Sequence, residues 1–257
     1  MNKLDELFAQ KQKNILNIYC TAGFPYLNST TEVMLALQQH GADIIELGIP
    51  YSDPVADGPV IQQSNMQALE NGMNIELLFS QLTSIKELLT VPVILMGYIN
   101  PVLQFGVENF CSAAAACGVS GIILPDLPMY EYEKKYKTIF KKYALHAIFL
   151  VSPVTSKERI KKADALSKGF LYAVSSSSTT GANNIKEDKQ AYFTKIKNMQ
   201  LRNPVLIGFG IKDKESFNQA AAHAAGGIIG TAFIQHISTA ADLNEATAQF
   251  IAGIRGN

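Results

Sequence analysis

The sequence lacks the features that mark several common classes of protein. It has no tryptophan, and its three cysteines, Cys20, Cys111 and Cys117, have neither a disulfide framework nor the spacing of a zinc site. Its four histidines are scattered along the chain. We therefore expect reduced thiols in a cytoplasmic protein, and no metal site.

The chain also lacks an excess of charge. Lys plus Arg and Asp plus Glu both number 22, so the formal net charge is zero. A surface for nucleic acid or an anionic membrane needs a basic excess, and neither partner is expected. No stretch reaches the roughly 18 uninterrupted apolar residues of a membrane-spanning helix. The N-terminus carries Lys3, Asp5 and Glu6 where a signal peptide would have a basic segment and an apolar run, so none is expected.

What the sequence does have is a regular alternation of apolar strands and helices. Its 257 residues suit either one α/β barrel or two small domains, and no linker or shift in composition divides them. A short amphipathic helix over 5–11 precedes the first strand, and each strand is followed by at least one helix. The expected strands are 15–20, the segment around Glu46, 91–95, 121–124, 146–151, 170–174, 205–207 and 227–229.

Eight such units in about 250 residues predict a single α/β domain over residues 1–257, a (β/α)8 TIM barrel with an extra N-terminal helix. An open doubly wound sheet is the alternative, but it would leave edge strands, and none of these strands is charged like an edge. Among the helices, one is expected to be capped by Thr30 or Thr31 and to run to His40, with Gly41 stopping it. Single helices are expected over 74–89 and 130–143.

The segment 44–59 combines a buried strand with two carboxylates. Glu46 lies among apolar residues without a local cation, and an unpaired buried charge costs roughly several kcal/mol. Asp57 follows in an Ala-Asp-Gly-Pro loop, from which it can reach back over the end of the strand. A lone Glu is more often on a solvated edge or in an ion pair, and an Asp in such a loop is usually a turn former. Two acids on one strand and its loop nevertheless suggest proton transfer.

Glycines gather in the last two loops of the predicted barrel, Gly208-Phe209-Gly210 and Gly230-Thr231. In such barrels these loops commonly hold a phosphate on backbone N–H groups and a short helix N-terminus. Glycines that merely end strands are the alternative, but two such loops in consecutive units favour a phosphate site. The polar loop 175–181 is predicted to be a lid, with a plain flexible linker as the alternative.

A largely apolar pocket is expected beside these loops. Its walls would be residues at strand ends, most of which would be barrel core under any hypothesis: Tyr19, Met96, Ile123, Leu150, Tyr172 and Phe209. A phosphate at one end and a buried carboxylate opposite describe a flat hydrophobic phosphate ester acted on by acid/base chemistry. No strand interior offers a lysine, which argues against a Schiff-base aldolase.

The segment Ile45-Glu-Leu-Gly-Ile-Pro-Tyr-Ser-Asp-Pro-Val-Ala-Asp-Gly-Pro59 closely resembles the signature of the tryptophan synthase alpha subunit family. Further motifs match in order over essentially the whole chain: Thr21-Ala-Gly-Phe-Pro, Met96-Gly-Tyr-Ile-Asn, Pro125-Asp-Leu-Pro, Thr180-Gly181, Gly208-Phe-Gly-Ile and Gly230-Thr231. The resemblance implies a lyase of tryptophan biosynthesis, without metal or organic cofactor. It would cleave indole-3-glycerol phosphate to indole and glyceraldehyde 3-phosphate by a retro-aldol reaction.

The resemblance also implies a role for each matching residue. Glu46 would protonate indole C3 and help to remove the glycerol hydroxyl proton, while Asp57 would hold the indole N–H and stabilise positive charge on the ring. Phosphate would bind the N–H groups of Gly181, Gly210, Gly230 and Thr231, with Thr180 also at the substrate. The indole would lie between Tyr19, Met96, Tyr172 and Phe209.

A partner is implied as well, the tryptophan synthase beta subunit in an α2β2 complex. The loop from Pro50 through Asp53 and the segment around Asn100 and Pro101 would face it. Ser176 and Ser178 stand where family members often carry Arg and Gly, which leaves loop closure and its coupling to the partner open. Thr231 keeps the hydroxyl of the more frequent Ser. A stand-alone lyase that releases indole and a non-catalytic subunit that binds phosphate esters are the alternative functions.

Overall fold

The structure, a computed structural model, describes residues 1–174, 185–208 and 210–256, with residues 185–190 described by their backbone alone. The strands of the described residues form one parallel sheet in the order β5-β4-β3-β2-β1-β9-β8-β7-β6. Their bounds are β1 Ile15–Thr21, β2 Ile44–Gly48, β3 Val93–Met96, β4 Gly121–Ile123, β5 His146–Ala147, β6 Leu150–Val151, β7 Leu171–Val174, β8 Val205–Gly208 and β9 Gly226–Ile229.

The sheet closes on itself because its two end strands are halves of one strand. Only two residues separate β5 from β6, and the backbone of both is bonded into the sheet. Ile148 N donates to Ile122 O at 3.1 Å on the β4 side, and Phe149 O accepts from Tyr172 N at 3.1 Å on the β7 side. The predicted strand 146–151 is therefore continuous, the barrel has eight strands, and the doubly wound alternative is wrong.

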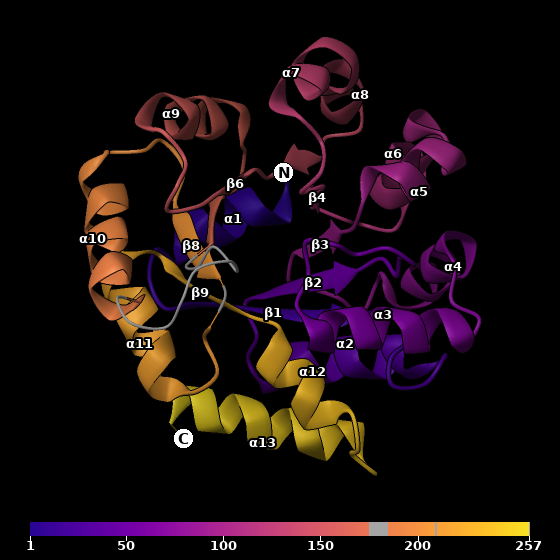
Figure 1. Ribbon diagram of the computed structural model, residues 1–257. Coiled ribbons are helices and arrows are strands. Elements are labelled where there is room, and N and C mark those ends of the chain that lie inside the picture. Colours follow the sequence, from indigo (N-terminus) through magenta and orange to yellow (C-terminus); the bar gives the residue numbers. More distant parts are fainter. Residues whose placement is uncertain (175–184, 209, 257) are drawn as a thin grey trace.

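The helices surround the ring of strands (Figure 1). Their bounds are α1 Lys3–Gln10, α2 Ser29–His40, α3 Pro59–Glu70, α4 Ile75–Ile85, α5 Ile99–Phe105, α6 Val107–Ala116, α7 Met129–Glu131, the π-helical turn η1 Tyr132–Tyr136, α8 Lys137–Lys142, α9 Lys157–Leu166, α10 Ile185–Asn198, α11 Lys214–His223, α12 Thr231–Ile237 and α13 Leu243–Arg255. The chain is thus a single α/β domain with the TIM-barrel architecture. No helix of the described residues is long and apolar enough to cross a membrane.

Alternation along the strands divides the core in two. One set of side chains fills the inside of the barrel, with Ile15, Ile44, Ile94 and Ile228 among them. The residues between them point outward and pack under the helices, as Ile18 and Ile45 do.

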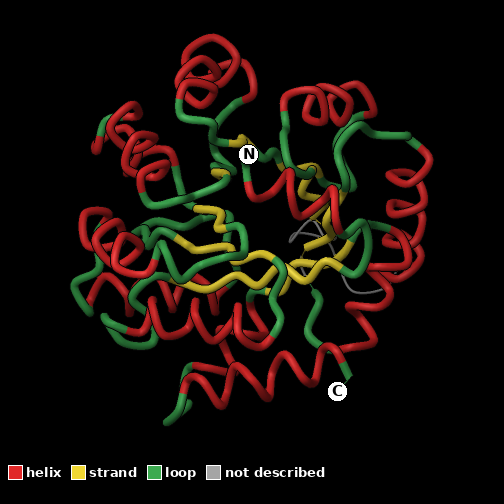
Figure 2. Tube along the Cα trace, turned by 180° about the vertical axis from the view of Figure 1, so that it is seen from behind, coloured by secondary structure: helices red, strands yellow, loops and turns green. Residues whose placement is uncertain are grey.

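The extra N-terminal helix closes the bottom of the barrel, the end at which the strands begin. Figure 2 shows α1 lying across the centre of the ring of strands. Its Leu4 is fully buried in the inner core, and Leu7 and Phe8 pack against the same cluster. Asn2 caps the helix by accepting from Leu4 N at 2.9 Å, and its Nδ2 donates to Ser120 O at 2.8 Å, at the start of β4.

Several local predictions were wrong. The helix predicted over 74–89 ends at Ile85, and the helix predicted over 130–143 contains the π-helical turn η1. Neither Thr30 nor Thr31 caps α2, because the helix already begins at Ser29 and Thr30 Oγ1 accepts a hydrogen bond from Gly23 N. Gly41 ends α2 with φ of 105°, as predicted.

Two short helices that follow strands directly were not predicted. Pro101 lies in the first turn of α5, where a missing N–H is tolerated, and the Asp126 carboxylate accepts from Ile99 N at 2.9 Å. The second helix, α12, begins at Thr231, directly after β9 and Gly230. Its position puts a helix N-terminus in the last loop of the barrel.

Candidate active site

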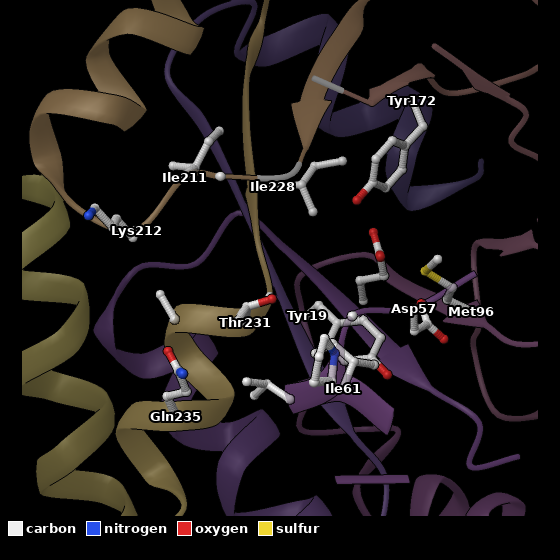
Figure 3. Close-up of a pocket in the computed structure, with 17 residues that line it drawn as sticks. Tyr19, Asp57, Ile61, Met96, Tyr172, Ile211, Lys212, Ile228, Thr231 and Gln235 are labelled. Carbon is white, nitrogen blue, oxygen red and sulfur yellow. The ribbon is translucent and has the colours of Figure 1, made fainter. Parts of the chain in front are cut away.

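A cavity of about 370 Å³, whose lining is drawn in Figure 3, opens at the carboxyl ends of the strands. This end of the barrel is opposite the one that α1 closes. Parallel barrels place their functional side chains at this end, because the loops that follow the strands converge there. The cavity is lined by Tyr19, Glu46, Asp57, Gly58, Pro59, Val60, Ile61, Met96, Tyr172, Gly210, Ile211, Lys212, Ile228, Gly230, Thr231, Ala232 and Gln235.

The structure therefore brings together eight of the residues that the sequence singled out: Tyr19, Glu46, Asp57, Met96, Tyr172, Gly210, Gly230 and Thr231. Thr180, Gly181 and Phe209 lie outside the described residues, as do Ser176, Ser178 and the rest of the predicted lid over 175–181. Ile123 and Leu150 do not line the cavity and belong to the inner core beneath it.

Glu46 is the buried acid of the cavity. It stands in the middle of β2 with 1% of its surface exposed, so the expectation of a carboxyl inside the barrel is confirmed. Its Oε2 accepts a hydrogen bond from Asn17 Nδ2 of β1 at 2.9 Å. None of the ion pairs found among the described residues involves Glu46.

Burial controls the protonation of this carboxyl. Loss of solvation raises the pKa of Glu46 from 4.5 to about 8, with a smaller rise from the nearby Asp57 and a lowering by the Asn17 hydrogen bond. At neutral pH, Glu46 is therefore mainly a protonated acid that can give a proton to a bound molecule.

Asp57 reaches the same cavity from the loop between β2 and α3. Its Oδ2 accepts a hydrogen bond from Tyr98 Oη at 3.1 Å, and the same hydroxyl accepts from Ala56 N at 3.0 Å. Tyr98 is held in turn by the ring of Tyr51, stacked at 5.1 Å between centroids. Burial raises the pKa of Asp57, and the Tyr98 hydrogen bond lowers it.

Two tyrosines wall the cavity, and each leans over a glycine of the neighbouring strand. A methyl group built on Gly48 of β2 would lie 2.1 Å from Tyr19 Oη, and one built on Gly208 of β8 would lie 2.4 Å from Tyr172 Oη. Both contacts are far below van der Waals distance, so only glycine leaves room for these rings. The hydroxyl of Tyr172 points into the cavity (Figure 3).

The other end of the cavity offers backbone N–H groups. Gly230 and Thr231 lie at the start of α12, where the first N–H groups have no partner within the helix. Gly210 adopts φ of 76°, a conformation that suits glycine. Lys212 and Gln235 also line this end.

Among the residues of the site that sequence reasoning missed are three polar or charged ones, Asn17, Tyr98 and Lys212. Asn17 carried a usable signal, since it is a polar residue within an apolar strand, as Glu46 is. Tyr98 lies within the Met96-Gly-Tyr motif, but its bond to Asp57 depends on a loop conformation that the sequence does not reveal. Lys212 had no signal, because an exposed lysine after a glycine loop is common.

The four residues predicted to face a partner lie after β2 and β3, on the rim around the cavity. Asp53 and Asn100 are exposed, Pro101 is half-buried, and Pro50 is buried within this chain. The loop after β2 also carries the exposed apolar side chain of Val55, and α5 carries that of Leu103.

No group of three or more His, Cys, Asp and Glu side chains that could hold a metal ion exists among the described residues. The three cysteines are free and buried.

Comparisons with known proteins agree on one family. The family model described as tryptophan synthase alpha chain matches residues 6–255. The tryptophan synthase alpha chain of Flavobacterium johnsoniae is 50% identical over 239 residues, which is 93% of this chain and 94% of that protein.

Solved structures give the same result. The tryptophan synthase subunit alpha of Legionella pneumophila superposes with a TM-score of 0.90 at 34% identity, covering 100% of this chain and 98% of that one. A chain of the tryptophan synthase complex from Pyrococcus furiosus superposes with a TM-score of 0.87 at 32% identity, covering 96% of this chain and 100% of that one.

Proposed function

The chain belongs to the tryptophan synthase alpha chain family, and from this premise we propose that Glu46 and Asp57 carry out its reaction in the cavity above the barrel. The enzyme is a lyase that cleaves indole-3-glycerol phosphate to indole and glyceraldehyde 3-phosphate in tryptophan biosynthesis. The observation that carries the proposal is a buried carboxyl whose pKa is raised to about 8 and which lines the cavity.

Glu46 acts first as an acid. It gives its proton to C3 of the indole ring, and the ring takes up a positive charge at its nitrogen. The carboxylate of Asp57 accepts a hydrogen bond from the indole N–H and stabilises that charge. Tyr98 holds Asp57 in place by its hydrogen bond.

Glu46 then acts as a base. As a carboxylate it takes the proton of the glycerol hydroxyl beside C3, the C–O bond becomes a carbonyl, and the bond between that carbon and C3 breaks. The electrons of the broken bond neutralise the ring, which leaves as indole. Glu46 ends the cycle protonated, as it began.

The two ends of the cavity match the two ends of this substrate, the indole ring and the phosphate. Tyr19, Met96 and Tyr172 supply apolar walls for the indole beside the two acids. At the other end, the N–H groups of Gly210, Gly230 and Thr231 bind the phosphate, and the Lys212 side chain adds a positive charge at the mouth.

The expected partner is a tryptophan synthase beta subunit in an α2β2 complex. The likeness to a chain of the Pyrococcus furiosus tryptophan synthase complex supports a partnership of this kind. The rim with Asp53, Asn100 and Pro101 supplies the docking surface. A biosynthetic reaction and free, buried cysteines fit a cytoplasmic location.

The test is a direct assay for indole released from indole-3-glycerol phosphate, with and without a beta subunit. Glu46→Gln is expected to lower the rate by about 10²-fold or more with the fold intact, the usual loss for a general acid/base, and Asp57→Asn by a similar factor. An unchanged rate would remove the altered residue from the mechanism. High activity of the chain alone would favour a stand-alone lyase.

A further inference from the structure

Asn17 is a polar side chain in an apolar layer of the barrel interior. It is fully buried in β1, and its register partners are Ile44 of β2 and Ile228 of β9. A leucine at this position would be as apolar as its neighbours and would bring no buried polar group that needs a hydrogen bond. The amide makes one hydrogen bond, from Nδ2 to Glu46 Oε2 at 2.9 Å, while its Oδ1 is buried without a partner among the described residues.

The unpartnered Oδ1 means that the amide does not serve the stability of the core, because a buried polar atom without a hydrogen bond is destabilising. What the amide does supply is an N–H donor directed at one particular oxygen of Glu46. In a protonated carboxyl the carbonyl oxygen is a better acceptor than the hydroxyl oxygen, so a donor fixed on Oε2 favours the carbonyl at that position. The proton of the acid is therefore favoured on Oε1.

We propose that Asn17 is a positioning residue that holds Oε2 of Glu46 as an acceptor and so directs the acidic proton to Oε1, the oxygen left for the cavity. The inference rests on the proposed function of Glu46. No hydrogen bond from Oε1 to another described residue occurs, and Glu46 lines the cavity. One oxygen is thereby anchored, and the other is available to the substrate.

The other described groups around Glu46 do not stabilise its carboxylate form. Asp57 faces it from the β2–α3 loop, Tyr19 and Cys20 lie on β1, and Tyr172 lies on β7. On the β3 side its register partner is the uncharged Ile94. Asp57 disfavours the carboxylate by repulsion, and burial raises the pKa of the two tyrosines and the cysteine, which stay neutral.

Asn17 therefore stabilises Glu46 in the half of the cycle when it is charged. After the proton has moved to indole C3, the carboxylate stands in a dry site until it takes the hydroxyl proton. The N–H of Asn17 is the hydrogen-bond donor to it among the described residues. Removing this donor disfavours the carboxylate relative to the acid.

The experiment compares the pH profiles of indole release for the parent and Asn17→Leu, with a beta subunit present. Activity of the parent should decline as pH rises past the pKa of Glu46, because the acid is the form that starts the reaction. In Asn17→Leu, kcat should fall about tenfold to a hundredfold, the alkaline limb should move to higher pH by about one unit, and KM should change less than about twofold. The same kcat and the same limb as in the parent would overturn the inference.

Ile15→Val is the matched control, since Ile15 is fully buried in the same strand and changes no hydrogen-bonding side chain. It should lower stability without moving the alkaline limb. Glu46→Gln measured in parallel separates the two proposals. If it loses activity while Asn17→Leu behaves like the parent, the proposed function stands and the inference fails. If Glu46→Gln keeps full activity, both fail.

A second measurement guards against a leucine variant that does not fold. The carboxyl C=O stretch of Glu46 can be followed by infrared difference spectroscopy and assigned by its loss in Glu46→Gln. In Asn17→Ser, which is smaller and lacks the amide, the midpoint of this band should move to higher pH. A midpoint equal to that of the parent would also overturn the inference.

Discussion

Glu46 lowers the stability of the folded protein when its carboxyl is ionised. Burial raises the pKa of its carboxyl to about 8, so ionising it costs more in the folded protein than in the unfolded chain. A glutamine at this position would keep the shape and could still accept the bond from Asn17. Activity and stability are therefore expected to respond to Glu46→Gln in opposite directions.

The effect on stability depends on pH. Below the ordinary value of 4.5 the carboxyl is protonated in both states, and above about 8 it is ionised in both. Between these values the folded state binds more protons, so the free energy of unfolding falls as pH rises. Glu46→Gln removes this loss, and its Tm should exceed that of the parent by about 5 °C or more at about pH 9, but hardly at all at about pH 4.

Thermal unfolding of both proteins at the two pH values checks this. Glu87→Gln is the control, because the side chain of Glu87 is exposed and its removal should leave the Tm unchanged at either pH. Equal Tm values for Glu46→Gln and the parent at the higher pH would mean that Glu46 ionises as easily in the folded protein as in water.

At the scale of single elements, the position of a side chain on one strand depends on the residue that faces it on the neighbouring strand. Tyr19 reaches the cavity only because β2 has glycine at position 48, and Tyr172 only because β8 has glycine at position 208. In Gly48→Ala the new methyl group would meet Tyr19 Oη, so the ring has to move. We expect a loss of about 1–3 kcal/mol in stability and a higher KM.

Denaturant unfolding and steady-state kinetics measure both effects. The matched control is Gly253→Ala in α13, where an added methyl group would meet nothing within 4 Å. That change should be neutral or raise stability by up to about 1 kcal/mol, because alanine favours a helix. If the two alanine variants were equally stable and active, the close fit of Tyr19 against Gly48 would not exist.

The helix α1 contributes to stability and not to chemistry. Leu4 is fully buried in the inner core at the end of the barrel away from the cavity. Leu4→Ala should cost about 2–5 kcal/mol in the free energy of unfolding and leave kcat within about twofold. Gln10→Ala, exposed on the same helix, should change neither quantity. A large fall in kcat with Leu4→Ala would show that the floor influences the cavity.

The limits of sequence reasoning appear at this same scale. Local signals predicted well where the cause is local. Gly41 ends α2 in a left-handed conformation as predicted, and the helix predicted from residue 74 does begin there, with Asn74 as its cap. The helix α5 was missed because the carboxylate that caps it belongs to Asp126, which is distant in sequence.

The residues of the site also divide into those that a local sequence signal predicts and those that depend on distant contacts. Glu46 could be predicted because a carboxyl within an apolar strand is itself a signal, and the glycine-rich loops after the last two strands indicated Gly210 and Gly230, which line the other end of the cavity. The contact between Asn17 and Glu46 could not, because it requires the register that places Tyr19 of β1 beside Glu46 of β2. Such pairings follow from the closed sheet and not from neighbouring residues.

At the scale of the whole molecule, the rim around the cavity is the surface where a partner is expected. Leu103 on α5 is 48% exposed and follows the predicted interface residues Asn100 and Pro101. Leu103→Glu should weaken association with a beta subunit by about tenfold, because a charge would be buried in the interface, while activity of the chain alone stays the same.

Leu88 offers the comparison, since it is 59% exposed but precedes β3 at the opposite end of the barrel. Leu88→Glu should leave association unchanged. Analytical ultracentrifugation of mixtures with the beta subunit measures both variants, and equal affinities would place the partner elsewhere on the surface.

The helix α1 also affects the path by which small molecules reach and leave the cavity. Because Leu4, Leu7 and Phe8 pack into the inner core at the bottom of the barrel, the described residues leave the cavity open at the carboxyl ends of the strands, and a substrate bound as proposed would enter and leave by this mouth. A protein bound over that mouth would therefore control both the entry of substrate and the exit of product.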